Sequence, residues 1–154
     1  MNWCVGQTEN PETKQPYKHA KSAASLAPLD AVAGKKYKQI SEPIFGCFVV
    51  YRHTSKWKGH TGFLYGMTKK GAYILLGGNQ DQTVKFSSYD DYTSNSKKKK
   101  LWGFYIPEDY TPTEADKLVE SDYYDDGNND NYDDGDIINK KFGIGTGKNT
   151  GSTN

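Results

Sequence analysis

Residues 59–80 have the sequence GHTGFLYGMTKKGAYILLGGNQ, in which two apolar runs flank a Lys-Lys-Gly turn. The first run covers 61–66 and the second covers 72–76, and both are rich in the aromatic and aliphatic residues typical of strands. The turn between them is short enough to join neighbouring antiparallel strands. We therefore predict a pair of antiparallel strands that form part of a meander.

Further strand and helix signals lie on both sides of this pair. The run PIFGCFVVY at 43–51 predicts a buried strand, TVKF at 83–86 a short one, and LWGFYI at 101–106 a last one. An alanine-rich stretch at 20–33 predicts a short, partly irregular helix. We expect an α+β fold in which short N-terminal helices pack on an antiparallel β-sheet of about five strands.

Charge and composition divide the chain. Of the 154 residues, 1–110 carry 16 Lys+Arg against 9 Asp+Glu (net +7), whereas 111–154 carry 4 against 10 (net −6). The second segment is rich in Asp, Asn and Gly, and such a composition does not bury a core. We predict one domain over 1–110, followed by a disordered acidic tail over 111–154 with a short helix near 113–118.

The sequence disfavours several classes of partner. The positive charge is not gathered into the basic stripe of a nucleic-acid-binding protein. No apolar stretch approaches the roughly 18 residues of a membrane span, and the N-terminus lacks a signal-peptide pattern. The acidic run at 122–136 places Tyr124 or Tyr132 where a calcium loop needs an oxygen ligand, and the two cysteines lack zinc-site spacing. We expect no nucleic acid, no membrane span and no metal.

His60 is the candidate for acid–base chemistry. It follows a glycine at the start of an apolar strand, where its ring can face a groove. The neighbouring strand ends in the sequence GGNQ at 77–80, and its glycines let the backbone bend so that an amide approaches His60. An amide oxygen that accepts from one imidazole nitrogen fixes the tautomer and leaves the other nitrogen to take a thiol proton. We predict His60 as the general base, with Asn79 as its orienting group and Gln80 as the alternative.

Each part of this pattern also has a simpler explanation. A lone histidine beside glycine is common on exposed surfaces, and Gly-Gly-Asn is a common turn. The remaining histidines, His19 and His53, lie in a polar segment and just after a strand, so we expect structural or solvated roles for both.

Four blocks of the sequence resemble the successive strands of bacterial and phage peptidoglycan amidohydrolases of the NlpC and CHAP type. The blocks are GCFVVY (46–51), GHTGF (59–63), LLGGNQ (75–80) and LWGFYIP (101–107). Their order and spacing match together, and the resemblance covers roughly residues 1–108. It implies a papain-like α+β fold, a Cys-His-Asn site and cleavage of amide bonds in cell-wall peptides. It implies no metal or organic cofactor.

The resemblance leaves two alternatives for the nucleophile. In such proteins a Trp-Cys pair opens an apolar helix, which often carries a second Asn-Trp-Cys-like segment near its end. Cys4 after Trp3 is the nucleophile in the first alternative. In the second, which the polar residues soon after Cys4 favour, it is the later cysteine and the nucleophile lies upstream of Met1. Cys47 lies within a strand, where a cysteine is usually an inert small hydrophobe.

The resemblance also implies a mechanism and partners. A cysteine thiolate attacks a peptide carbonyl, His60 protonates the leaving amine, and water resolves the thioester. We expect Trp3, Trp57, Tyr65 and Gln80 to bind substrate, although core packing explains the aromatic residues equally well. The expected partners are peptidoglycan stem peptides and an inhibitor or immunity protein, with action in the periplasm or cell wall. The alternative is a catalytically incomplete hydrolase fold that acts as a wall-binding or protein-interaction module.

Overall fold

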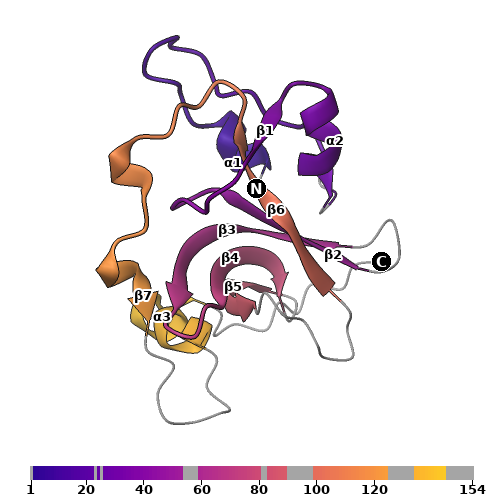
Figure 1. The fold of residues 1–154 in the computed structure, drawn as a ribbon. Helices are drawn as coiled ribbons and strands as arrows, with labels where there is room; N and C mark the ends of the chain where they lie inside the picture. The colour runs from indigo at the N-terminus through magenta and orange to yellow at the C-terminus, as the bar shows by residue number, and fades with distance from the viewer. Residues whose placement is uncertain are drawn as a thin grey trace.

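The computed structural model describes residues 2–22, 24, 26–53, 59–80, 83–89, 99–124 and 134–144. Within these residues the chain is an α+β fold, in which a mostly antiparallel sheet carries a few short helices (Figure 1). The expected α+β class and antiparallel sheet are thus confirmed. The described sheet has seven strands instead of about five. The two additional strands are too short for a sequence signal and gain their hydrogen bonds from distant partners.

The strands coincide with the predicted apolar runs, except that the run at 43–51 is strand only from Phe48, after Gly46 with a φ of 76°. They are β1 (Tyr37–Ile40), β2 (Phe48–His53), β3 (Gly59–Thr68), β4 (Tyr73–Gln80), β5 (Thr83–Tyr89), β6 (Lys99–Pro107) and β7 (Tyr123–Tyr124). Their order in the sheet is β1-β6-β2-β3-β4-β5, and β7 pairs in parallel with β3. The helices are α1 (Asn2–Gly6), α2 (Ala27–Ala33) and α3 (Asp134–Phe142), with 3-10 turns η1 (Glu114–Asp116) and η2 (Glu120–Asp122).

Apolar side chains gather on both faces of the sheet. The buried residues of the first group, the central core, are Ile44, Cys47, Val49, Tyr51, Leu64, Tyr73, Leu75, Phe104 and Ile106. Those of the second group, the α1–α2 cluster, are Tyr37, Phe48, Val50 and Tyr105, against which Val5, Leu26 and Leu29 pack. Consecutive residues of a strand point to opposite faces, so Val49 and Val50 of β2 belong to different groups. The central core and the α1–α2 cluster therefore lie on opposite faces of the sheet.

The helices occupy separate regions of the molecule. Figure 1 shows α1 and α2 beside β1 and β6 at one end, and α3 beside β7 at the other. The helix expected over 20–33 is shorter, and Pro28 lies in its first turn, where the missing N–H costs no helical hydrogen bond. No described helix is long and apolar enough to cross a lipid bilayer.

The acidic segment departs from the prediction of disorder in its described part. It contains both 3-10 turns, β7 and α3. Ile138 of α3 is 1% exposed and packs with Ile74 and Phe86 in a third apolar group, the α3 cluster. The Asn139 side chain accepts from the Phe86 N–H and donates to the Phe86 carbonyl, both at 2.8 Å. Ile138 and Ile144 in the α3 cluster, the ring of Phe142 beside Phe86, and the Asn139 amide together dock the described part of this segment.

Candidate functional site

His60 lies near the start of β3 and faces the central core. It pairs with Tyr51 of the neighbouring strand β2. Its ring stacks on the ring of Tyr89 in β5, with centroids 5.1 Å apart and an interplanar angle of 13°. Tyr51 belongs to the central core and Tyr89 packs against it, so the imidazole lies on that face of the sheet. The stacking restricts the orientation of the His60 ring.

Gln80, at the end of β4, carries an amide that lies near this ring. Its side chain is 5% exposed; its Oε1 accepts from the Tyr89 hydroxyl at 2.9 Å and its Nε2 donates to the Gly77 carbonyl at 3.0 Å. A Cβ built at Gly77 would lie 3.0 Å from His60 Nε2 and 3.0 Å from Gln80 Nε2. The missing side chain at Gly77 therefore leaves room for both the imidazole and the amide.

Asn79, the first choice for the orienting residue, has a different position. Its side chain is exposed and its backbone φ is 58°, in the left-handed region. The pairing of β4 with β5 shifts register between Gly77 and Gln80, so Asn79 lies within this irregularity. Asparagine tolerates the left-handed conformation better than most residues. Asn79 thus shapes the strand end, while Gln80 turns its amide inward.

Cys4 is not brought together with His60. It lies in α1 and is exposed, and its neighbour Val5 packs against the α1–α2 cluster. That cluster covers the face of the sheet opposite to the central core, where His60 stacks on Tyr89. The sheet therefore separates the Cys4 thiol from the imidazole.

Cys47 is a buried core residue. It is 2% exposed, and burial raises the pKa of its thiol to about 12. A thiol with this pKa stays protonated at neutral pH and is a poor nucleophile. Cys47 also lies four positions before Tyr51, the partner of His60, which corresponds to roughly 13 Å along an extended chain. The structure thus separates both cysteines from His60.

The predicted substrate-binding aromatics are dispersed. Trp3 on α1 is 73% exposed, so its ring is open to a ligand. Tyr65 packs against the α3 cluster, with its ring centroid 4.7 Å from that of Phe86 and 5.9 Å from that of Phe45. Packing therefore accounts for Tyr65. Trp57 lies outside the described residues.

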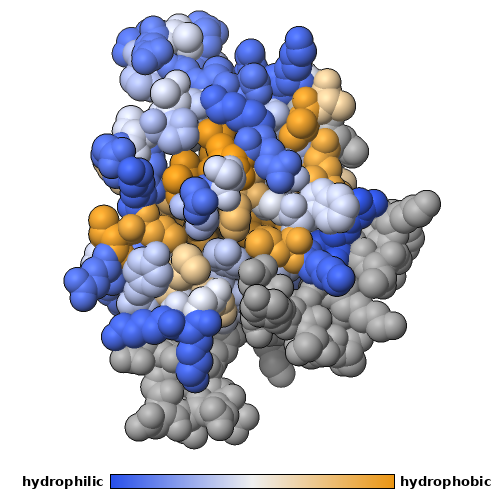
Figure 2. Space-filling model, in the orientation of Figure 1, coloured by the Kyte–Doolittle hydropathy of each residue, from blue (hydrophilic) through white to orange (hydrophobic). Residues whose placement is uncertain are grey.

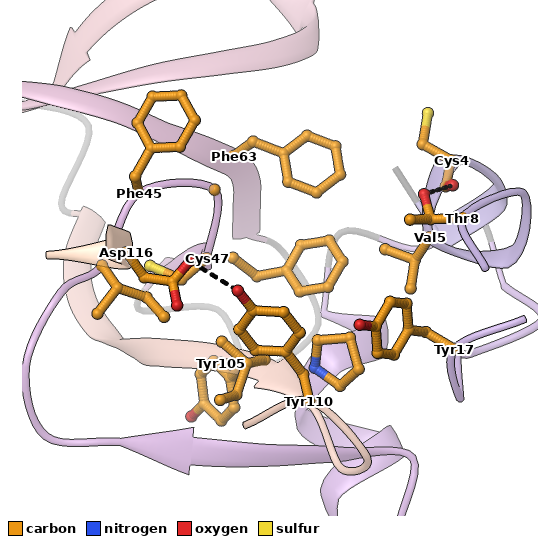
Figure 3. Close-up of a pocket in the computed structure, with 15 residues that line it drawn as sticks. Cys4, Val5, Thr8, Tyr17, Phe45, Cys47, Phe63, Tyr105, Tyr110 and Asp116 are labelled. Carbon is orange, nitrogen blue, oxygen red and sulfur yellow. Dashed lines mark hydrogen bonds between the residues drawn. The ribbon is translucent and has the colours of Figure 1, made fainter. Parts of the chain in front are cut away.

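A cavity of about 330 Å³ lies between α1, the chain before β2, and the segment after β6 (Figure 3). Its walls include Cys4, Tyr17, Phe45, Phe63, Tyr110 and Asp116. Figure 2, in the orientation of Figure 1, shows hydrophobic residues in the middle of the visible face, among hydrophilic ones. No sequence pattern predicts this cavity, because its walls come from segments that are far apart in the chain. The only signal was the high content of tyrosine.

One charged group belongs to the cavity wall. The Tyr110 hydroxyl donates to Asp116 Oδ1 at 2.6 Å, and Asp116 Oδ2 accepts from the Thr113 N–H at 2.6 Å. Burial opposes ionisation of Asp116, but the hydrogen bonds from Tyr110 and Thr113 outweigh it and lower the pKa of the carboxyl. Burial and the bond to Asp116 raise the pKa of Tyr110 to about 12. At neutral pH the wall thus presents a carboxylate and a neutral phenol.

No family model, curated protein or solved structure matches the chain. The candidate sites are therefore two arrangements of this chain's own residues. The first is the imidazole of His60 with Tyr89 and Gln80 on the central-core face. The second is the aromatic cavity with Asp116 beside α1. The first has the groups of a proton-transfer site, and the second has those of a binding site.

Proposed function

We propose that this chain is a peptidoglycan amidohydrolase domain of the papain-like NlpC and CHAP type, with His60 as its general base. One observation carries the proposal. The glycine-histidine start of β3 and the Gly-Gly-Asn-Gln end of β4 belong to neighbouring strands, and Gln80 and His60 share the space left by Gly77. The sequence resemblance implies this arrangement, in which a histidine base at the start of one strand lies near an amide at the end of the neighbouring strand.

The proposed role of His60 is proton transfer. An imidazole held by stacking on Tyr89 is oriented before the substrate arrives, which favours transfer to and from a fixed position. It would take the proton of a thiol and give it to the amine that leaves the stem peptide. This chemistry needs a thiol at the His60 ring. Because α1 packs on the α1–α2 cluster and keeps Cys4 away from that ring, the proposal requires α1 to leave this cluster when substrate binds.

Turnover of purified peptidoglycan tests this proposal. Wild type should release peptides or new amino groups, and His60→Ala should lower the rate by about 10²-fold or more, the usual contribution of a general base. Equal release by wild type and Cys4→Ser would remove Cys4 from the mechanism. Absence of release by the wild-type chain, or full activity of His60→Ala, would contradict the proposal.

Two neighbouring glycines provide a matched control for the geometry. Gly77→Ala places a methyl 3.0 Å from both His60 Nε2 and Gln80 Nε2, closer than ordinary contact, so it should displace these side chains and lower turnover. Among the described residues, a Cβ at Gly78 meets Val84 Cγ2 alone, at 4.0 Å, so Gly78→Ala should retain the wild-type rate. Equal rates for the two variants would show that the arrangement around His60 is irrelevant to activity.

A second candidate is a wall-binding module without hydrolysis. The separation of Cys4 and His60 on opposite faces favours it, as does a cavity of about 330 Å³, which lies within the range of ligand sites. This candidate predicts that the protein co-sediments with insoluble peptidoglycan, releases nothing, and binds equally well as His60→Ala. Release of peptides by wild type but not by His60→Ala would exclude it.

A further inference from the structure

The cavity beside α1 combines aromatic rings with a single kind of charge. Tyr17 and Tyr110 meet edge to face, with ring centroids 5.7 Å apart. Figure 3 shows Phe45 and Phe63 on the other side of the cavity from Tyr110. Asp116 lies at its wall, and no lysine, arginine or histidine is among the described lining residues. A ligand inside would thus meet apolar ring faces and one carboxylate.

The surroundings of the cavity add to its negative potential. The pKa of Tyr17 is raised by burial and also by the charges of Asp109, Glu12 and Asp116. These acidic groups act on a ring that forms part of the cavity wall. Negative charge around the cavity disfavours a bound anion and favours a bound cation. The faces of aromatic rings also attract positive charge, so the walls favour a cation as well.

We propose that this cavity binds an alkylammonium group on a short aliphatic chain, as in a lysine-like side chain of a peptide. The methylenes would lie against Phe63 and Tyr110, and the ammonium would approach Asp116. Asp116 Oδ1 accepts the Tyr110 hydroxyl and retains a lone pair for a further donor. The inference deepens the proposed function and rests on it for the source of the amine, a diamino acid of the stem peptide.

The apolar walls alone would also accept an uncharged alkyl chain. The ionised carboxylate of Asp116 discriminates between these two ligands, because it attracts the ammonium and does not attract the uncharged chain. A carboxylate-bearing ligand would be repelled by Asp116. The three ligand classes therefore have a defined order of affinity, with amine first, alkyl second and carboxylate last.

Binding of three small probes to the full chain tests this order. The probes are the N-acetyl methylamides of lysine, norleucine and glutamate, titrated with detection by NMR or calorimetry. The lysine probe should bind at least about tenfold more tightly than the norleucine probe, and the glutamate probe should bind most weakly. Equal affinity of the lysine and norleucine probes, tighter binding of glutamate, or no binding of lysine would overturn the inference.

Variants localise the binding. Asp116→Asn should weaken the lysine probe about tenfold, and Tyr17→Leu, which keeps the carboxylate, about threefold. The matched control is Glu114→Gln, which removes an exposed charge two residues away that pairs with Lys117 at 2.8 Å and does not line the cavity. It should leave the affinity unchanged. Unchanged affinity in Tyr17→Leu, or equal losses in Asp116→Asn and Glu114→Gln, would overturn the assignment.

The probes also separate this inference from the proposed function. Binding of the lysine probe by a chain that releases nothing from peptidoglycan keeps the cavity assignment and removes the hydrolase. Peptidoglycan turnover without binding of the lysine probe keeps the hydrolase and removes the cavity assignment.

Discussion

The two cysteines show how much the surroundings of a single residue decide. Cys4 is exposed on α1, whereas Cys47 is buried in the central core and its thiol has a pKa of about 12. Reaction with an aromatic disulfide reagent at pH 8 should therefore modify Cys4 quickly and Cys47 only after unfolding in urea. The Cys4→Ser variant is the control and should show no fast phase. Two fast thiols in wild type would contradict the burial of Cys47.

Burial of the Cys47 thiol also makes the free energy of unfolding depend on pH in the alkaline range. The unfolded Cys47 thiol loses its proton near its ordinary pKa of 9.0, but the folded thiol keeps its proton up to about 12. Its stabilising contribution is thus complete below pH 9 and is lost as the pH rises towards 12. The unfolding free energy should fall by up to about 1.4 kcal/mol per pH unit from this group.

Urea unfolding between pH 8 and 10.5 measures this slope. Cys47→Ala should be less stable at every pH, because a buried side chain is truncated, and its stability should fall less steeply with pH. Parallel pH dependences of wild type and Cys47→Ala would show that the thiol does not titrate differently in the folded state.

At the scale of elements, α3 shows how a polar segment joins the fold. Asn139 makes two hydrogen bonds to the backbone of Phe86 in β5. Asn139→Ala leaves a buried N–H and carbonyl without these bonds and should cost about 2 kcal/mol. It should also speed hydrogen exchange at the Phe86 amide, while the exposed Lys140→Ala changes neither. Wild-type exchange at Phe86 in Asn139→Ala would mean that α3 is not docked through this amide.

At the scale of the whole molecule, the sheet separates Cys4 from His60, two residues that the sequence suggested as a catalytic pair. A thiol beside an imidazole changes the chemical shifts of the ring protons, so its removal is visible in the NMR spectrum. With Cys4 and His60 on opposite faces, the His60 ring signals should have the same chemical shifts in wild type and Cys4→Ser. Tyr89→Leu, which removes the stacked ring and its ring current, should shift them. A change caused by Cys4→Ser would place the pair together in solution.

Local sequence pattern was sufficient to predict β2–β6 and the pairing of β3 with β4, because strand alternation and turn chemistry act between near neighbours. β1 and β7 have no such sequence signal, because strands this short form through hydrogen bonds to strands that are distant in the chain. The inward turn of Gln80 follows from the irregular pairing at the end of β4, where Asn79 takes a positive φ. The side of the sheet that receives α1, and the cavity beside it, depend on contacts between distant segments. No pattern within one segment encodes such contacts, since they arise only when the chain folds and the sheet gains two faces.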